Sequence, residues 1–306
     1  MATLGALRLQ AQQRSDMENS PAVTAQEWNN YISLSYAELF DILVGAYGNE
    51  YFAAPPFQFI LTGSQFYDLP LDFYKLTGVD LQYSGSPSGW VTLRRFEFIE
   101  RNKYAYPNTA TNFLGYTNLR YRLMGDSLEL IPIPMSGQIV RVWYIPRPIP
   151  LQFMPSSSIV INTPFVTLLP SDFSNIQVGM NVAGPSIQTN TVVTAVDPLL
   201  NEVTLSKNAM ATNPTATLSF WNDSVTIDGI AGWEEYLIID AAIKALIKQE
   251  QDIQPLLIQK GAIKARIESM AEGRDAGQAH HVSDVLSISG FGMDGIGSPY
   301  GWESSW

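Results

Sequence analysis

The sequence contains no cysteine and only two histidines among its 306 residues. Without cysteine, a disulfide framework and thiolate zinc sites are both excluded. The two histidines, His280 and His281, are adjacent, and adjacent side chains point in different directions on any regular element, so they make a poor pair of metal ligands. A serine triad or a histidine acid-base scheme would depend on this same pair. We therefore expect no enzyme, and no catalytic, cofactor or metal site.

Charge is also scarce. Charged residues make up 15% of the chain, and their formal balance is −11 at pH 7. A surface that tracks nucleic-acid phosphates needs clustered Lys and Arg, so this balance argues against one, although it allows an acidic channel through which DNA slides without binding. The low charged share fits two interpretations equally well: surface hidden in an assembly, or a β-rich protein with an uncharged polar surface.

Long apolar runs are missing as well. The first 20 residues contain no apolar core, so we expect no signal peptide, and no run approaches the length of a membrane span. These absences predict a soluble protein made for an intracellular compartment, with no membrane partner.

Helical periodicity is present near the two ends of the chain. Residues 24–47 begin with a capping box, Thr24 and Glu27. Residues 232–250 and 255–273 predict two more helices. We expect an apolar face of the first helix to pack on one of the second; the predicted contact residues are Trp28, Ile32, Leu39 and Leu43 on the one, and Leu237, Ala241 and Ala245 on the other.

Between the helices, the pattern changes to short strand-like runs. Residues 57–149 predict a meander or small sandwich, with Gly125-Asp126 as a hairpin turn. Residues 151–221 hold only four charged residues and predict an inserted β module whose ends lie close together. The expected class is therefore α+β: a helical body from the N- and C-terminal segments plus a small antiparallel β region, with an inserted all-β domain and an extended C-terminal tail. The predicted ranges are 1–150 for the first part of the body, 151–221 for the insert, 222–285 for the second part of the body and 286–306 for the tail.

Three motifs have simple interpretations. A GxGxxG pattern at Gly290, Gly292 and Gly295 lacks the preceding strand and following helix that a phosphate-binding loop needs. The pair Glu234-Glu235 stands at a helix start, where it offsets the helix dipole. A carboxylate-only hydrolase stays open as an alternative, although no acid-base pair indicates one. One stretch is rich in basic residues: Arg94, Arg95, Arg101 and Lys103, interleaved with Phe96, Phe98 and Tyr104. In an acidic protein such a stretch favours pairing with an acidic neighbouring subunit over stacking on nucleic-acid bases.

The last 17 residues form a glycine-rich segment that carries aromatic side chains. Glycine opposes order, whereas aromatic side chains are well suited to filling pockets on a partner. We therefore expect the segment to be mobile in the free protein and to dock onto a partner through Phe291, Tyr300, Trp302 and Trp306.

Three stretches together resemble the head-to-tail adaptor proteins of tailed bacteriophages. They are LPLDFYKLTGVDL (69–81), LELIPIPMSGQIVRVWYIPRPIPL (128–151), and the helical segment 241–285 with an Arg-Asp-x-Gly loop, here Arg274, Asp275 and Gly277, followed by Asp284. The insert is separately similar to small β modules of phage virion proteins.

The resemblance implies a structural virion protein at the head-tail junction, synthesised in the host cytoplasm. Its expected form is a homo-oligomeric ring, commonly of twelve copies, that binds the portal protein and a tail or nozzle protein and extends the DNA channel without binding DNA specifically. The aromatic tail residues would then be portal anchors. The alternative is a receptor- or carbohydrate-binding virion protein, drawing on Trp90, Trp143 and Trp221, although such tryptophans more often belong to a core.

Overall fold

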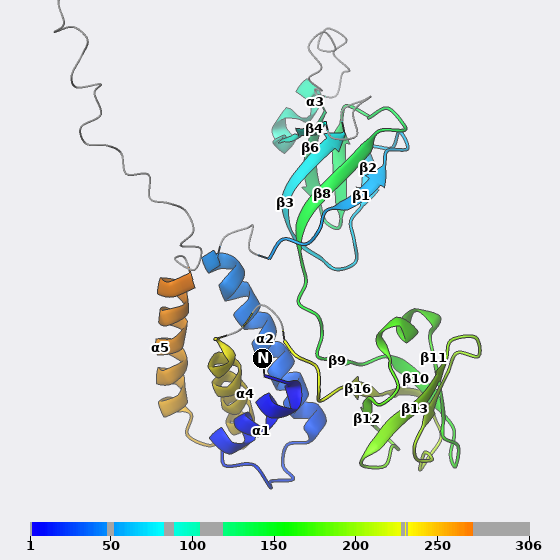
Figure 1. Cartoon of the computed structure of the whole chain (residues 1–306), viewed down its shortest axis with the longest axis vertical. Coiled ribbons are helices and arrows are strands. Elements are labelled where there is room, and N and C mark those ends of the chain that lie inside the picture. Colours follow the sequence, from blue (N-terminus) through cyan, green and yellow to red (C-terminus); the bar gives the residue numbers. More distant parts are fainter. Residues whose placement is uncertain are drawn as a thin grey trace, which may run out of the picture. The chain divides into compact units, whose positions relative to one another are not determined.

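A computed structural model describes residues 2–47, 52–82, 89–104, 119–227, 230 and 232–271 of the chain. Within these residues it contains helices near both ends of the chain and three sheets between them (Figure 1). The helices are α1 (Leu4–Arg14), α2 (Ala25–Tyr47), the short α3 (Arg101–Tyr104), α4 (Glu234–Lys248) and α5 (Gln254–Ala271).

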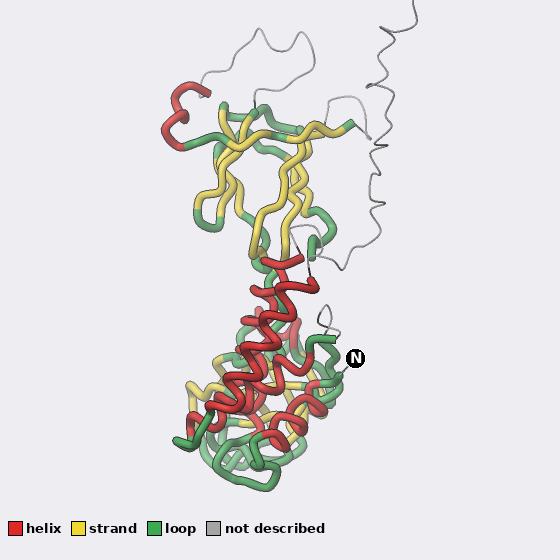
Figure 2. Tube along the Cα trace, turned by 90° about the vertical axis from the view of Figure 1, so that its left-hand side faces the viewer, coloured by secondary structure: helices red, strands yellow, loops and turns green. Residues whose placement is uncertain are grey.

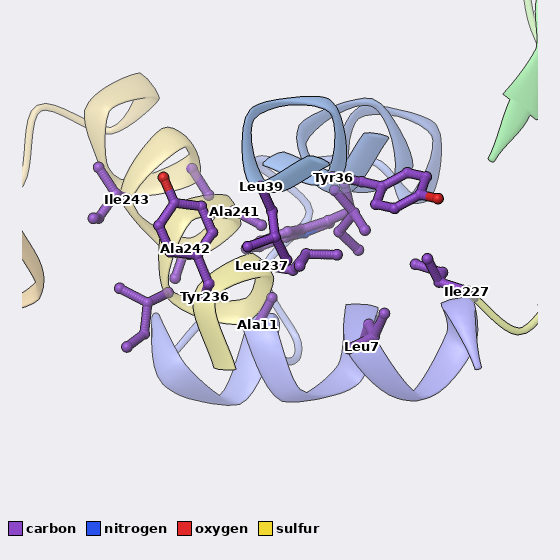
Figure 3. Close-up of a cluster of buried hydrophobic side chains, with 14 of the residues drawn as sticks. Leu7, Ala11, Tyr36, Leu39, Ile227, Tyr236, Leu237, Ala241, Ala242 and Ile243 are labelled. Carbon is purple, nitrogen blue, oxygen red and sulfur yellow. The ribbon is translucent and has the colours of Figure 1, made fainter. Parts of the chain in front are cut away.

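Four of these helices, α1, α2, α4 and α5, pack together as a helical layer around one core (Figure 1). The predicted contact between α2 and α4 is confirmed, because Leu39 and Leu237 lie in that core and are both 0% exposed (Figure 3). The capping box is also confirmed: the Thr24 amide donates to Glu27 Oε2 at 2.9 Å, and the Glu27 amide donates to Thr24 Oγ1 at 3.3 Å. Local sequence and tertiary packing therefore agree on where α2 begins and which face it buries.

Helix α1 was not among the expected elements. Thr3 caps it by accepting a hydrogen bond from the Ala6 amide, and its buried side chains are Leu4, Leu7 and Ala11. Their spacing of three and four residues places all three on one side of the helix, within the core. Figure 3 shows Leu7 and Ala11 on the side of α1 that faces α2 and α4. The signal was present in the sequence but short, because only three of the apolar residues of α1 are buried.

The segment between α2 and residue 146 forms two four-stranded sheets that share a core, and Figure 2 shows their strands as two layers. One sheet has the order β1-β8-β3-β4 and the other β2-β7-β6-β5. The predicted hairpin turn is confirmed, with Gly125 at φ 59° between β6 and β7. The strands are β1 (Phe57–Ile60), β2 (Phe66–Asp68), β3 (Phe73–Gln82), β4 (Trp90–Thr92), β5 (Arg94–Arg95), β6 (Arg120–Met124), β7 (Ser127–Ile131) and β8 (Ile139–Pro146).

The third sheet has eight strands in the order β15-β10-β11-β14-β13-β12-β16-β9. All its strands surround one core, so the sheet curls over on itself. Its two ends in the sequence are adjacent, because Gln152 pairs with Trp221. That the insert is an autonomous domain stays a prediction. The strands are β9 (Gln152–Phe153), β10 (Ser156–Ile159), β11 (Phe165–Leu168), β12 (Asn181–Ala183), β13 (Thr191–Asp197), β14 (Glu202–Leu205), β15 (Asn213–Thr217) and β16 (Ser219–Trp221), with 3-10 turns η1 (Phe98–Glu100) and η3 (Pro170–Asn175) elsewhere.

The expected fold class, a helical body with a small antiparallel β region, is wrong. The described chain is mostly β, with sheets of four, four and eight strands and only five helices. The β region before the insert has its own core between two sheets, so it does not depend on the helices to bury its apolar side chains. It is also not purely antiparallel, because β5 pairs in parallel with β6.

Candidate functional site

The residues expected to dock on a partner lie outside the described part of the chain. These are the tail aromatics Phe291, Tyr300, Trp302 and Trp306 and the loop residues Arg274, Asp275, Gly277 and Asp284. The same holds for His280, His281 and the GxGxxG pattern. Their roles stay predictions, and the site is built here from the residues that the structure does place.

The predicted basic stretch forms a compact corner at the end of one sheet. Arg94 and Arg95 lie exposed on the edge strand β5, and η1 and α3 follow directly. Two guanidinium groups lie over the ring of Phe98, those of Arg101 and Arg122, each 4.4 Å from its centroid. Arg101 also donates to the Phe98 carbonyl at 3.1 Å. We call this surface the basic corner; its residues are Arg94, Arg95, Phe98, Ile99, Arg101, Lys103, Arg120 and Arg122.

The sequence alone did not associate Arg120 and Arg122 with this corner. They join it because β6 pairs with β5, with Arg94 opposite Arg120. Nη1 of Arg122 is buried without a hydrogen-bond partner, and so is Oε2 of Glu129, the residue opposite it on β7. Two opposite charges therefore face each other across the strands, and each keeps an unsatisfied atom within the described residues.

A second cluster lies on the β1-β8-β3-β4 sheet, around the buried carboxylate of Asp80. Its Oδ2 accepts hydrogen bonds from Arg141 Nε and Trp143 Nε1, both at 2.8 Å, and its Oδ1 accepts from Thr92. Burial alone would raise the pKa of Asp80, but these hydrogen bonds outweigh it and hold the pKa below its usual value. The Arg141 guanidinium also covers the rings of Trp90 and Trp143, at 4.1 and 5.2 Å. The cluster ties three strands together.

A pocket of about 400 Å³ lies where α2 begins beside β12 and the loop that follows it. Its lining is uncharged and includes Gln26, Asn181, Gln188 and Thr191. Trp221 also lines it, but that side chain is only 6% exposed, and its indole N–H donates to Asp223 at 3.1 Å. The pocket therefore offers amide and hydroxyl groups rather than an open aromatic face.

The helical layer contains a buried polar network centred on Asp240, which is 2% exposed. One carboxylate oxygen accepts from Lys244 on the same helix, and the other accepts from Lys260 of α5 at 2.7 Å. Lys260 also donates to Glu38 of α2 at 2.8 Å, and Lys244 donates to Ser35 at 3.0 Å. We call these residues the Asp240 network. It links α2, α4 and α5 through charge, in addition to their apolar contacts.

The network predicts a loss of stability in acid. Burial alone raises the pKa of Asp240, but hydrogen bonds from Lys244, Lys260 and Ser35 outweigh it, so the folded-state pKa lies below the unfolded value of about 3.9. A group with a depressed pKa stabilises the fold above its unfolded pKa, and this contribution is lost as pH falls through the folded pKa. Glu38 and Tyr236 also face the network. Both residues are unchanged in a variant that alters Asp240 alone, so their titration cancels when that variant is compared with wild type.

We therefore expect the difference in the free energy of unfolding between wild type and Asp240→Asn to be constant from about pH 5 to pH 8, and to shrink below about pH 4. Urea unfolding at a series of pH values measures this difference. A difference that stays constant down to pH 2 would contradict the assigned direction of the shift.

Every Lys and Arg of the four packed helices has a partner within the described residues. Five contact carboxylates: Arg8 with Asp223, Lys244 with Asp240, Lys248 with Glu27, Lys260 with Glu38 and Asp240, and Lys264 with Glu268. The other two are Arg14, which donates to Gln259 at 2.6 Å, and Arg266, whose guanidinium lies 5.3 Å from the centre of the Trp233 ring. Five of the seven positive charges therefore have a carboxylate of the chain beside them, and the other two contact a neutral amide and an aromatic ring.

No protein-family model matches the chain, and a comparison with curated proteins finds no match. Among the described residues, no group of three or more His, Asp or Glu is placed to hold a metal ion, and no helix there is long and apolar enough to cross a membrane. The resemblance to phage adaptors stays a prediction.

Proposed function

We propose that the chain is a structural subunit of a ring, and that the ring is the head-to-tail adaptor between the capsid portal and the tail of a tailed bacteriophage. Its partners are further copies of the same chain, commonly twelve in a ring, together with the portal protein and a tail or nozzle protein. The proposal assigns it no catalysis and no cofactor. Its place is the head-tail junction of the virion.

The observation that carries this proposal is that every cation of the helical layer contacts another group of the chain, in most cases a carboxylate. A wall that lines a DNA channel must not hold phosphates, because each free Lys or Arg that contacts a phosphate adds to binding through counterion release. In the four helices, five of the seven Lys and Arg side chains contact carboxylates of the chain, and the other two contact an amide and an aromatic ring. The whole chain has a balance of −11. Such a layer lets DNA pass without specific binding.

The test is assembly on portal. Purified chain mixed with the portal protein of the same virus is expected to form a ring complex, and native mass spectrometry gives its stoichiometry. Removing residues 290–306 is expected to leave a folded subunit that no longer stays on portal, because each copy contributes its own anchor and the losses multiply through avidity.

Trp302→Ala combined with Trp306→Ala is expected to reproduce most of that defect, and Ser304→Ala is the matched control in the same segment. If the truncated chain assembles on portal as well as the full chain does, the tail is not the anchor. If neither binds portal, the adaptor proposal is wrong.

The alternative, a receptor- or carbohydrate-binding virion protein, is an outcome of the same experiment, in which monomeric chain binds glycans and ignores portal. Its aromatic residues are engaged within the protein, since the Arg141 guanidinium covers the rings of Trp90 and Trp143, and Trp221 is buried. These contacts favour the adaptor over the alternative.

A further inference from the structure

The basic corner concentrates positive charge in an otherwise acidic protein. Residues 83–124 hold six of the 18 Lys and Arg but only two of the 29 Asp and Glu, so they carry +4 and the rest of the chain carries −15. Like charges held this closely repel one another, and an anionic partner relieves that repulsion. Arg94 and Arg95 make no ion pair within the described residues, and the neighbouring segments 83–88 and 105–118 contain no Asp or Glu.

The corner has the character of a protein interface rather than of a phosphate-binding surface. Five of its six cations are Arg, which protein interfaces favour over Lys. Ile99 is 88% exposed and Phe98 is 51% exposed. The two guanidinium groups over the Phe98 ring also leave less of it for stacking on a base.

The same chain carries a complementary surface at the opposite edge of the same sheet. The order β2-β7-β6-β5 places β5 and β2 at the two edges. Asp68 ends β2, and Asp126 lies in the adjacent turn between β6 and β7, where its carbonyl accepts a hydrogen bond from the Leu69 amide at 3.0 Å. Both carboxylates are exposed and make no ion pair within the described residues, and Leu71, three residues after Asp68, is 99% exposed. We call these three residues the acidic corner. Each corner thus combines exposed apolar side chains with two charges that make no ion pair within the described residues, Arg94 and Arg95 in the one and Asp68 and Asp126 in the other.

We propose that the basic corner of one copy binds the acidic corner of the next copy. This contact would be the interface between subunits of the proposed ring. It rests on the proposed function, because both require copies of the chain to associate. Two different patches that match each other make a head-to-tail contact, which closes into a ring when the rotation between copies allows it. Within one copy the two corners are apart: three strand spacings, about 14 Å, separate Asp68 on β2 from Arg94 and Arg95 on β5. Asp126 lies in the turn after β6, at the opposite end of that strand from Arg120, which pairs with Arg94.

Charge reversal tests the contact without changing the core. Arg94→Glu with Arg95→Glu puts negative charge at the two positions of the basic corner that make no ion pair and lowers the charge of residues 83–124 from +4 to 0. Asp68→Lys with Asp126→Lys makes the acidic corner positive. Each reversed protein alone is expected to self-associate more than about 100-fold more weakly than wild type in sedimentation velocity, because like charges then face each other. An equimolar mixture of the two is expected to associate again, since every contact then joins opposite charges. Arg94→Lys with Arg95→Lys keeps the charge and is the control.

The proposal falls if the mixture does not recover association, or if the reversed proteins associate as wild type does. It also falls if wild type binds duplex DNA, and Arg94→Glu with Arg95→Glu abolishes that binding while self-association stays unchanged. If rings still form on portal when the mixture fails, the interface is wrong and the adaptor function stands. If wild type is monomeric at every concentration and also on portal, both proposals are wrong.

Discussion

Replacing Asp240 with alanine is expected to lower the free energy of unfolding by about 3–5 kcal/mol, because removing one partner of a buried ion pair leaves the other charge uncompensated. Here two ammonium groups lose their acceptor, those of Lys244 and Lys260. Glu38 keeps one hydrogen bond from Lys260 but is 44% exposed, so it compensates only part of the loss. Urea unfolding at pH 7 followed by circular dichroism measures the change.

Glu268→Ala on α5 is the matched control, because it removes a carboxylate from an exposed ion pair. In that pair Lys264 Nζ lies 4.0 Å from Glu268 Oε1. Exposed pairs contribute at most about 1 kcal/mol. A loss below about 1 kcal/mol for Asp240→Ala would contradict the prediction, because it would show that water reaches the network. Replacing Asp240, Lys244 and Lys260 together with apolar residues is expected to be far less harmful than removing Asp240 alone, since no buried charge is then left unpaired. Glu38 loses its two lysines but is 44% exposed, so water solvates it.

The helices with strong periodicity were predictable from the sequence, because their signals come from residues that are close together in the chain. In α2 the capping box and the spacing of its apolar residues are both properties of neighbouring residues, so residues 24–47 predicted Ala25–Tyr47 closely. The same holds for α4 and α5. In α1 only three residues face the core, too few for the pattern to stand out.

The fold class was not predictable in the same way, because sheets are made by contacts between distant residues. The strand-like runs of residues 57–149 were recognised, but their division into two sheets depends on which runs pair. The pairing of β5 with β6 joins Arg94 to Arg120 in parallel, and no alternation of residue types indicates such a contact. The β region therefore seemed smaller in the sequence than it is.

In the candidate site, too, only the contacts between residues close in sequence were predictable. Arg94, Arg95, Arg101 and Lys103 are close in sequence and were predicted as a basic patch, whereas Arg120 and Arg122 reach it only through strand pairing. The Asp240 network had one local signal, the four-residue spacing of Asp240 and Lys244 on a helix. Its other members come from α2 and α5, and packing alone brings them together.

The packing of α2 on α4 gives the second large effect, expected for Leu39→Ala. Leu39 is fully buried in the core of the helical layer, beside Leu237 (Figure 3). Truncating such a side chain removes its transfer free energy and leaves a cavity that the surrounding helices fill only partly. The free energy of unfolding is therefore expected to fall by about 2–5 kcal/mol.

Leu34→Ala is the control that isolates burial from helix propensity. Leu34 lies on the same helix and undergoes the same change of residue, but it is 52% exposed. Its replacement is expected to change stability by only about 0.5 kcal/mol, as for most surface positions. Thermal and urea unfolding of the two variants, measured beside wild type, give the comparison directly. Equal effects at the two positions would show that α2 does not bury its Leu39 face against α4, and the packing of the helical layer would then be wrong.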